Sequence, residues 1–316
     1  MAADIPGAIF AVVLYSKKSV FILTLGEIRV IVRFQKRLYI ICICVAIATG
    51  VSSGGYSQND AASVRVTQWA DSLVLDDRVI EEIERFAADE DEGFGKGYAG
   101  NLAADLRRIV FADVTRRLDA ITAGKIDPFV EASYPEAGFA RTDEGKPDLK
   151  AERKFEESFV RTELVAVFKN NDISPETALR VYTSAEFRKK ASSRIERIWD
   201  EDGLNCVETT GVTMLLSPML SCSRVSELIS TGLAVQHSQV VGNGGSDGYQ
   251  PVYFKESVKT FVRVPGGLVL HYINYSRTVG MGGLKKSIGR KKIKGSQEDA
   301  IESFRSTIGP EAGDSG

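Results

Sequence analysis

The feature that most constrains the fold is a change in sequence character at Gly203. Before this residue, apolar side chains recur at helical spacing, as in Val64 to Ala88 and in Tyr98 to Ala123. After it, the apolar runs are short and rich in β-branched residues, as in Leu233 to Val241. A helical half followed by a strand-rich half is typical of an α+β fold. We therefore predict an N-terminal helical region followed by a mainly antiparallel sheet with a closing C-terminal helix.

Several helix boundaries can be placed in the region before Gly203. Ser174-Pro175 puts an N-cap residue before a first-turn proline. Thr183-Ser184-Ala185-Glu186 has the pattern of a capping box, which would open a helix running to about Trp199. The segment from Lys150 to Phe168 is also predicted to be helical. These signals predict a helical region up to residue 202.

The strand-rich half contains one clear hairpin. Val252 to Val264 and Leu268 to Thr278 flank Pro265-Gly266-Gly267, and proline followed by glycine suits the central positions of a type II turn. Ser296 to Ile308 then has the apolar spacing of an amphipathic helix. The predicted parts of the chain are a leader (1–48), a flexible lead-in (49–62), a helical domain (63–202), an α+β domain (203–310) and a disordered tail (311–316).

The leader has the layout of a secretory signal. The basic residues Arg33, Lys36 and Arg37 precede an apolar run from Leu38 to Ala48, which ends in the small-x-small pattern Ala46-Ile47-Ala48. This run is shorter than the roughly 20 residues of a membrane span. We predict an exported protein, periplasmic or secreted. A retained anchor over residues 38–54 and a buried core helix are the alternatives.

The signal begins well inside the chain. We expect residues 1 to about 31 to precede the true translation start, which a valine codon such as that of Val30 or Val32 would supply. Lipoprotein anchoring is not expected, because Cys42 and Cys44 each follow an isoleucine rather than a small residue. The two other cysteines, Cys206 and Cys222, are expected to form a disulfide in an oxidising compartment. Two free buried thiols are the alternative.

The composition narrows the class of protein. Hydrophobic residues make up 43% and charged residues 26% of the chain, which is ordinary for a globular protein. The formal net charge is −2, so no global attraction to nucleic acid is expected.

One segment resembles a known group of proteins. The residues concerned are Glu163-Leu164, Phe168, Ala178-Leu179, Val181-Tyr182-Thr183-Ser184 and Phe187-Arg188-Lys189. Over about residues 163–199, they are similar to a helix-turn-helix segment of small exported bacterial proteins of unknown function. Phe187 stands where those proteins have glycine. The resemblance implies a helical segment, and because that family has no assigned catalytic residues, it implies nothing about function.

A possible catalytic motif lies in the strand-rich half. Gly244 to Gly248 matches G-x-S-x-G, with Ser246 as the nucleophile and Glu256 and His271 as the remaining members of a triad. The residues after Ser246 look extended, whereas a nucleophile elbow requires a helix there. The pattern favours a flexible glycine loop between strands, with a hydrolase as the alternative.

Other motifs argue against cofactors and metals. Gly95 to Gly100 matches G-x-G-x-x-G, but an acidic helix precedes it where a dinucleotide site needs a strand. Asp89 to Gly93 resembles the start of a calcium loop, but Phe94 occupies the position that requires glycine. His237 and His271 lack the spacing of a zinc site. We expect no cofactor and no metal.

A basic segment follows the hairpin and is a candidate binding surface for an anionic partner. Its cations are Lys285, Lys286, Arg290, Lys291, Lys292 and Lys294. An anionic lipid surface, a cell-wall polymer or an acidic envelope protein would suit this charge, whereas a purely solvated face is the alternative. We therefore predict an exported, non-catalytic binding or interaction protein of the cell envelope. A hydrolase using Ser246 and a membrane-anchored envelope protein are the alternatives.

Overall fold

A computed structural model describes eight ranges of the chain: 20–25, 28–33, 60–89, 97–134, 159–211, 218–242, 252–278 and 284–309. The chain divides into two compact units, Met1–Ser52 and Ser53–Gly316. In the first unit, β1 (Val20–Leu25) pairs with β2 (Ile28–Arg33) in an antiparallel two-stranded sheet. The predicted signal run from Leu38 to Ala48, with Cys42 and Cys44, lies outside the described ranges.

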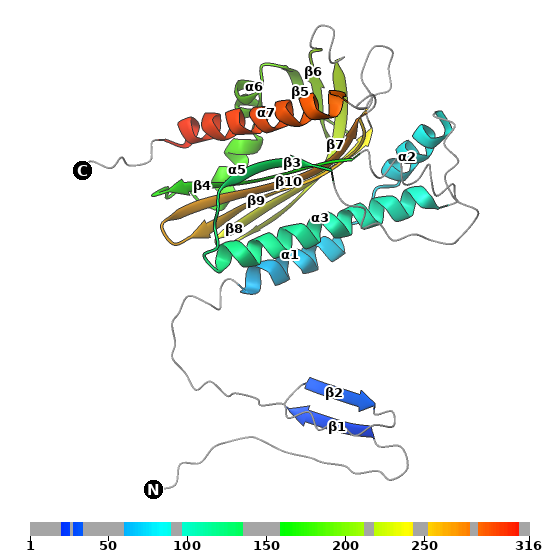
Figure 1. The fold of residues 1–316 in the computed structure, drawn as a ribbon, viewed down its shortest axis with the longest axis vertical. Helices are drawn as coiled ribbons and strands as arrows, with labels where there is room; N and C mark the ends of the chain where they lie inside the picture. The colour runs from blue at the N-terminus through cyan, green and yellow to red at the C-terminus, as the bar shows by residue number, and fades with distance from the viewer. Residues whose placement is uncertain are drawn as a thin grey trace. The chain divides into compact units, whose positions relative to one another are not determined.

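The second unit is built on an eight-stranded antiparallel sheet in the order β3-β4-β10-β9-β8-β7-β6-β5 (Figure 1). From β5 to β10 each strand pairs with the next one in sequence, and β10 then pairs with β4. The strands are β3 (Phe129–Ser133), β4 (Val160–Lys169), β5 (Ile195–Glu201), β6 (Leu204–Thr209), β7 (Met219–Ser230), β8 (Leu233–Gly242), β9 (Val252–Val264) and β10 (Gly267–Thr278).

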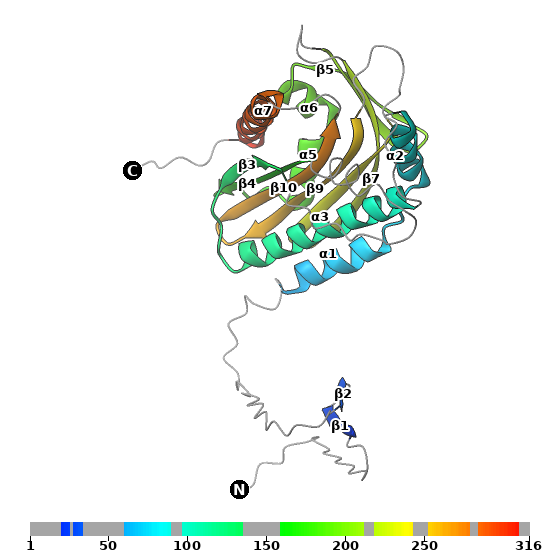
Figure 2. The same cartoon turned by 45° about the vertical axis from the view of Figure 1, so that its right-hand side comes forward.

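Helices cover both faces of this sheet (Figure 2). One face contacts α2 (Asp77–Asp89) and α3 (Tyr98–Thr122), with α1 (Asp60–Ser72) packed on α3; we call it the α3 face. The other contacts α5 (Pro175–Thr183), α6 (Ala185–Ala191) and α7 (Leu284–Ile308); we call it the α7 face. Successive side chains of a strand point to opposite faces, so each strand contributes to both layers.

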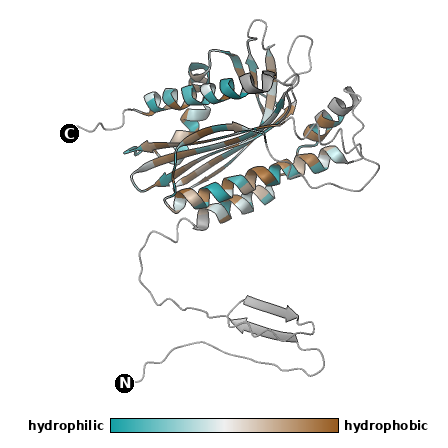
Figure 3. Ribbon diagram, viewed as in Figure 1, coloured by the Kyte–Doolittle hydropathy of each residue, from teal (hydrophilic) through white to brown (hydrophobic). Residues whose placement is uncertain are grey.

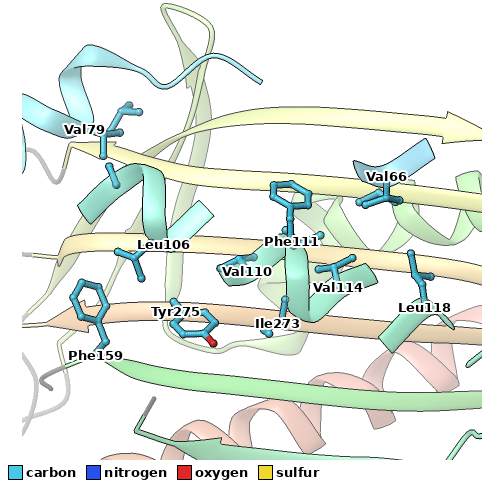
Figure 4. Close-up of a cluster of buried hydrophobic side chains, with 14 of the residues drawn as sticks. Val66, Val79, Leu106, Val110, Phe111, Val114, Leu118, Phe159, Ile273 and Tyr275 are labelled. Carbon is cyan, nitrogen blue, oxygen red and sulfur yellow. The ribbon is translucent and has the colours of Figure 1, made fainter. Parts of the chain in front are cut away.

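The core on the α3 face is aliphatic. Leu106, Val110, Val114 and Leu118 recur every four residues along α3, and all four are completely buried. They pack in one cluster with Ile273 and other strand residues (Figure 4). Burying each such side chain stabilises the fold by about 1.5–3 kcal/mol. Apolar residues along α3 and through the middle strands are visible in Figure 3.

The core on the α7 face contains a cluster of aromatic rings. Phe304 of α7 lies 5.2 Å from Phe168 and from Tyr182, and 5.6 Å from Phe187 and from Phe261, between ring centroids. These rings come from α5, α6, α7, β4 and β9, so the cluster fixes all three helices to the sheet. Ring pairs of this kind contribute about 0.5–1.5 kcal/mol each beyond their buried area.

Several predicted elements are confirmed. The hairpin of β9 and β10 is present, and Gly266 has the positive φ of 81° that a type II turn requires. Ser174 caps α5 through a hydrogen bond from the backbone N–H of Thr177, with Pro175 in the first turn. The closing helix α7 is present and begins before the predicted Ser296.

The prediction of a helix from Lys150 to Phe168 was wrong for its described part, where β4 begins at Val160. Seven of its ten residues are buried and the strand is covered on both faces, so the apolar pattern loses the simple alternation of a surface strand. The eight-stranded sheet therefore takes strands from both the range 63–202, predicted as a helical domain, and the range 203–310.

The helix predicted from the capping box to Trp199 is also shorter than expected. Ser184, not Thr183, is the N-cap of α6, and the helix ends at Ala191. Ile195 begins β5, which contains Trp199. The resemblance to a helix-turn-helix segment likewise fails to place Glu163 and Phe168, which lie on β4.

Candidate functional site

Glu163 is a buried carboxylate on the α3 face, and it has three partners. Arg117 of α3 donates from Nε to its Oε1 at 2.9 Å, and His271 Nε2 lies 3.0 Å from the same oxygen. Arg161 donates to the other oxygen. Burial alone would raise the pKa of Glu163, but the hydrogen bonds from His271 and Arg117 and the charge of Arg161 outweigh it and hold that pKa well below its usual range.

Glu256 is the second buried carboxylate on this face, and it is compensated in the same way. Its Oε1 lies 2.7 Å from His237 Nε2 and 3.5 Å from Arg107 Nε. Gln239 donates to its Oε2 at 2.8 Å. The α3 face therefore buries two carboxylates together with arginine, histidine and amide donors, as buried charges require.

These contacts change the interpretation of the predicted triad. Glu256 is bound to His237 rather than to His271, whose partner is Glu163. Ser246 lies outside the described residues. Both histidine–carboxylate pairs join neighbouring strands on the α3 face, and Arg107 and Arg117 of α3 contact their carboxylates.

The α7 face carries a polar row at one level of the sheet. Tyr272 of β10, Lys259 of β9, Gln236 of β8 and Glu227 of β7 are direct cross-strand neighbours. Lys259 Nζ donates to Gln236 Oε1 at 2.9 Å and lies 5.7 Å from the centroid of the Tyr272 ring. Gln236 Nε2 in turn donates to Glu227 Oε1 at 3.0 Å. The glutamine amide thus separates the lysine from the carboxylate.

Two further cations lie close to Lys259. Lys255 is on the same face of β9, four residues away, and Arg188 reaches toward the sheet from α6. Arg188 Nη1 donates to Asn205 Oδ1 at 2.8 Å. All three cationic side chains are half-buried. We call Arg188, Lys255 and Lys259 the cation cluster.

Burial and mutual repulsion perturb these groups. Burial, together with the charges of Lys255 and Arg188, lowers the pKa of Lys259 to about 7. Burial and the charge of Arg188 lower the pKa of Lys255 to about 8, and burial lowers the pKa of Arg188. Perturbation of several neighbouring groups in the same direction is typical of functional sites.

The charges of the cation cluster are not balanced by contacts. Among the residues that the structure describes, no carboxylate forms an ion pair with any of the three cations. Glu227 and Asp200 approach only through the amides of Gln236 and Asn205. On the same sheet face, the buried hydroxyl of Thr162 has no hydrogen-bond partner and can donate one hydrogen bond. The arrangement can accept an anion.

The sequence patterns did not identify this cluster as a site. Lys255 and Lys259 were placed in a predicted strand, where they alternate with Val258 and Thr260, and such positions are normally solvated on an antiparallel sheet. The sequence feature that could have indicated the site is the spacing of Lys255 and Lys259, which places both lysines on one face of the predicted strand. Its meaning depends on α5, α6 and α7, whose position over this face the sequence did not reveal.

The predicted basic surface lies on α7. Arg290, Lys291, Lys292 and Lys294 are exposed there, and Lys294 Nζ is 3.7 Å from Glu298. The guanidinium of Arg290 lies 5.2 Å from the centroid of the Tyr134 ring. The side chains of Lys285 and Lys286 lie outside the described part. Binding of an anionic surface here stays a prediction.

The predicted disulfide is confirmed. Cys206 of β6 and Cys222 of β7 are cross-strand neighbours, with an S–S distance of 2.03 Å. A crosslink that closes a loop of this length stabilises a protein by about 3 kcal/mol.

The other motifs give no site within the described ranges. Gly97 is the N-cap of α3, which begins at Tyr98, and the element before it is the helix α2 rather than a strand; Gly95 and Lys96 are not described. The predicted calcium-loop residues after Asp89 also lie outside the description. No group of three or more His, Cys, Asp or Glu in the described ranges could hold a metal ion. None of the helices described is both long and apolar enough to cross a membrane.

Comparison with known proteins yields similar structures only. No family model and no curated protein matches the chain. Human StAR-related lipid transfer protein 5 is 14% identical, with a TM-score of 0.40, and the match covers 66% of this chain and 96% of that chain. Human STARD10 is 13% identical, with a TM-score of 0.37, over 54% of this chain and 82% of its own. Likenesses of this size identify neither a ligand nor an activity for this chain.

Proposed function

We propose that this protein binds an organic anion on the α7 face, at the cation cluster of Arg188, Lys255 and Lys259. The observation that carries the proposal is the absence, among the described residues, of any carboxylate paired with these half-buried cations. Burying a charge without a partner is costly, and the α3 face of the same sheet avoids that cost at both of its carboxylates. A bound anion would supply the missing charge.

The surroundings of the cluster favour an anion attached to an apolar group. Phe261 follows Lys259 by two residues on the same strand face and belongs to the five-ring aromatic cluster. The Tyr272 ring flanks Lys259 on the other strand of the hairpin. Charged donors beside an apolar wall suit a carboxylate, sulfonate or phosphate carried on a hydrophobic body.

We also propose that binding takes place outside the cytoplasm. The signal-like run from Leu38 to Ala48 supports this, and the bridge between Cys206 and Cys222 is compatible with an oxidising compartment. Cell fractionation with N-terminal peptide mapping tests the idea. A chain that keeps peptides from residues 1–48 and stays in the cytoplasm would contradict it.

A matched pair of fluorescent probes tests the anion site. The probe 8-anilinonaphthalene-1-sulfonate carries a sulfonate, whereas N-phenyl-1-naphthylamine has the same rings without it. We expect the wild type to prefer the sulfonate, and Lys259→Met to weaken its binding about tenfold, corresponding to one lost charged contact of about 1.4 kcal/mol. Binding of the uncharged probe should change little.

Lys189→Met is the matched control, because Lys189 lies on α6 beside Arg188 but its side chain is exposed. It should bind the sulfonate as the wild type does. Circular dichroism would confirm that each variant is folded. Equal binding of the two probes by the wild type, or an equal effect of the two substitutions, would overturn the proposal.

A further inference from the structure

One member of the cation cluster has surroundings that differ from those of an ion-paired lysine. The only hydrogen-bond acceptor described for Lys259 Nζ is the uncharged amide oxygen of Gln236, at 2.9 Å. Gln236 is held in this orientation because its own N–H group donates to Glu227. The side chain of Lys259 also lies against the Tyr272 ring. Glu227 favours the ammonium form of Lys259 only from beyond the Gln236 amide, and this effect is smaller than those of burial and the neighbouring cations.

The neighbouring cations act in the same direction. Lys255 and Arg188 are near enough that their positive charges disfavour a further positive charge on Lys259, in addition to the effect of its burial. A lysine that is desolvated or placed next to another cation becomes a nucleophile, because near physiological pH a large fraction of its amine is neutral while the rest stays charged. The amine is therefore available where an anionic ligand would bind.

We propose that Lys259 condenses with the carbonyl carbon of an aldehyde or ketone that carries an anionic group, and that Lys255 and Arg188 hold that group. This inference rests on the anion site proposed above and names the class of ligand that it takes. Gln236 is a positioning residue, since it directs the lysine nitrogen and does not touch the carbonyl.

The chemistry needs no other reagent. The nitrogen lone pair of Lys259 attacks the carbonyl carbon and forms a C–N bond, while the π electrons of the C=O bond move to oxygen. A proton passes from nitrogen to oxygen to give a carbinolamine. Loss of the hydroxyl group with the second nitrogen proton releases one water and leaves a C=N bond. The imine is either the bound form of the ligand or the start of further chemistry on it.

The experiment uses 4-carboxybenzaldehyde as an anionic aldehyde and benzaldehyde as its uncharged counterpart. The full chain is incubated with each, reduced with borohydride, digested and mapped by mass spectrometry. We expect the reduced adduct of 4-carboxybenzaldehyde to be at least tenfold more abundant on Lys259 than on the exposed Lys189 of the same molecule. The preference should be smaller with benzaldehyde, which lacks the anionic group.

The pH dependence of adduct formation distinguishes an amine activated by its surroundings from an exposed lysine that reacts non-specifically. Adduct formation on Lys259 should reach half of its maximum near pH 7, because burial and the charges of Lys255 and Arg188 lower the pKa of Lys259 to about 7. Lys259→Arg, which keeps the charge but cannot form an imine, should lose the adduct. Its sulfonate binding should exceed that of Lys259→Met.

Each outcome decides the inference. The inference is overturned if the adduct on Lys259 is no more abundant than that on Lys189. It is also overturned if the adduct is found chiefly on Lys255. Both comparisons are made within the wild-type protein, so they need no variant that might misfold. If the wild type still prefers the sulfonate probe, the anion site stands and only the imine chemistry fails. If that preference is absent as well, the proposed function fails with it.

Discussion

The two faces of the sheet differ in whether their buried charges have partners of opposite charge among the described residues. Glu256 and Lys255 are consecutive residues of β9, so their side chains point to opposite faces. On the α3 face, Glu256 has contacts from His237, Gln239 and Arg107. On the α7 face, Lys255 has no carboxylate partner among the described residues.

This difference separates structural charges from functional ones. The α3 face is closed by α3 itself, whose Arg107 and Arg117 reach the two buried carboxylates, so these ion networks join a helix to the sheet. Among the described residues, no carboxylate pairs with the cation cluster on the α7 face, and burial together with mutual repulsion lowers the pKa values of Lys255 and Lys259. Compensated charges hold the layers in position, whereas uncompensated ones are available to a ligand.

Removing a compensated carboxylate should have the largest effect. Glu163→Gln would leave Arg117 and Arg161 without their buried partner, and we expect the free energy of unfolding to fall by about 3 kcal/mol. Urea denaturation measures this. Glu131→Gln is the control, because Glu131 lies opposite Glu163 on β3 and is exposed; it should change stability by less than about 0.5 kcal/mol. Equal effects of the two changes would contradict this account of the α3 face.

Removing an uncompensated cation should raise the stability of the protein, whereas removing a compensated carboxylate lowers it. Lys255→Met keeps much of the side-chain volume and deletes the half-buried charge, so we expect the ligand-free protein to gain about 1 kcal/mol of stability. Lys189→Met, with its exposed side chain, should have almost no effect. If Lys255→Met were as destabilising as Glu163→Gln, the two faces would not differ as described.

The pH dependence of stability should show the same contrast. The folded-state pKa values of Lys255 and Lys259, about 8 and about 7, lie below the unfolded value of about 10.4. Between about pH 7 and about pH 10 the unfolded state therefore binds more protons, and stability should rise with pH. Urea denaturation across this range checks it.

The double variant Lys255→Met/Lys259→Met should lose this rise while keeping the fold. A wild-type protein whose stability is flat or falls over the same range would show that the two lysines are not perturbed in the folded state. The α3 face responds at lower pH, because burial lowers the pKa of His271 and its protonation opposes folding as the pH falls through its usual value of about 6.5.

Replacing exposed charges should have the smallest effect on the free energy of unfolding, and it gives the reference against which the buried charges are compared. Lys291, Lys292 and Lys294 lie on the exposed side of α7, and the pair of Lys294 and Glu298 is open to solvent. Replacing all three lysines with glutamine should change the free energy of unfolding by less than about 0.5 kcal/mol. Thermal unfolding in low salt would detect more. A larger loss would mean that these lysines hold α7 on the sheet.

The sequence by itself determined the local features of this protein. The Pro265-Gly266 pair fixes the turn of the central hairpin, because only a residue that tolerates positive φ fits its second position. Ser174 and Pro175 begin α5 through a side-chain cap and a pre-set φ. Cys206 and Cys222 could be paired from their number and the predicted compartment. Each of these depends on a few neighbouring residues or on a simple count.

The tertiary structure alone decided the rest. β4 was predicted as a helix because a strand covered on both faces does not alternate, and its pairing with β10 joins residues about a hundred positions apart. The helices that cover the two faces of the sheet also determine which charges are paired. Glu163 is compensated because α3 brings Arg117 to it, and Lys259 is perturbed because α6 brings Arg188 near it. Burial and long-range contacts, rather than residue type, decide which of these charges are structural and which are free to bind.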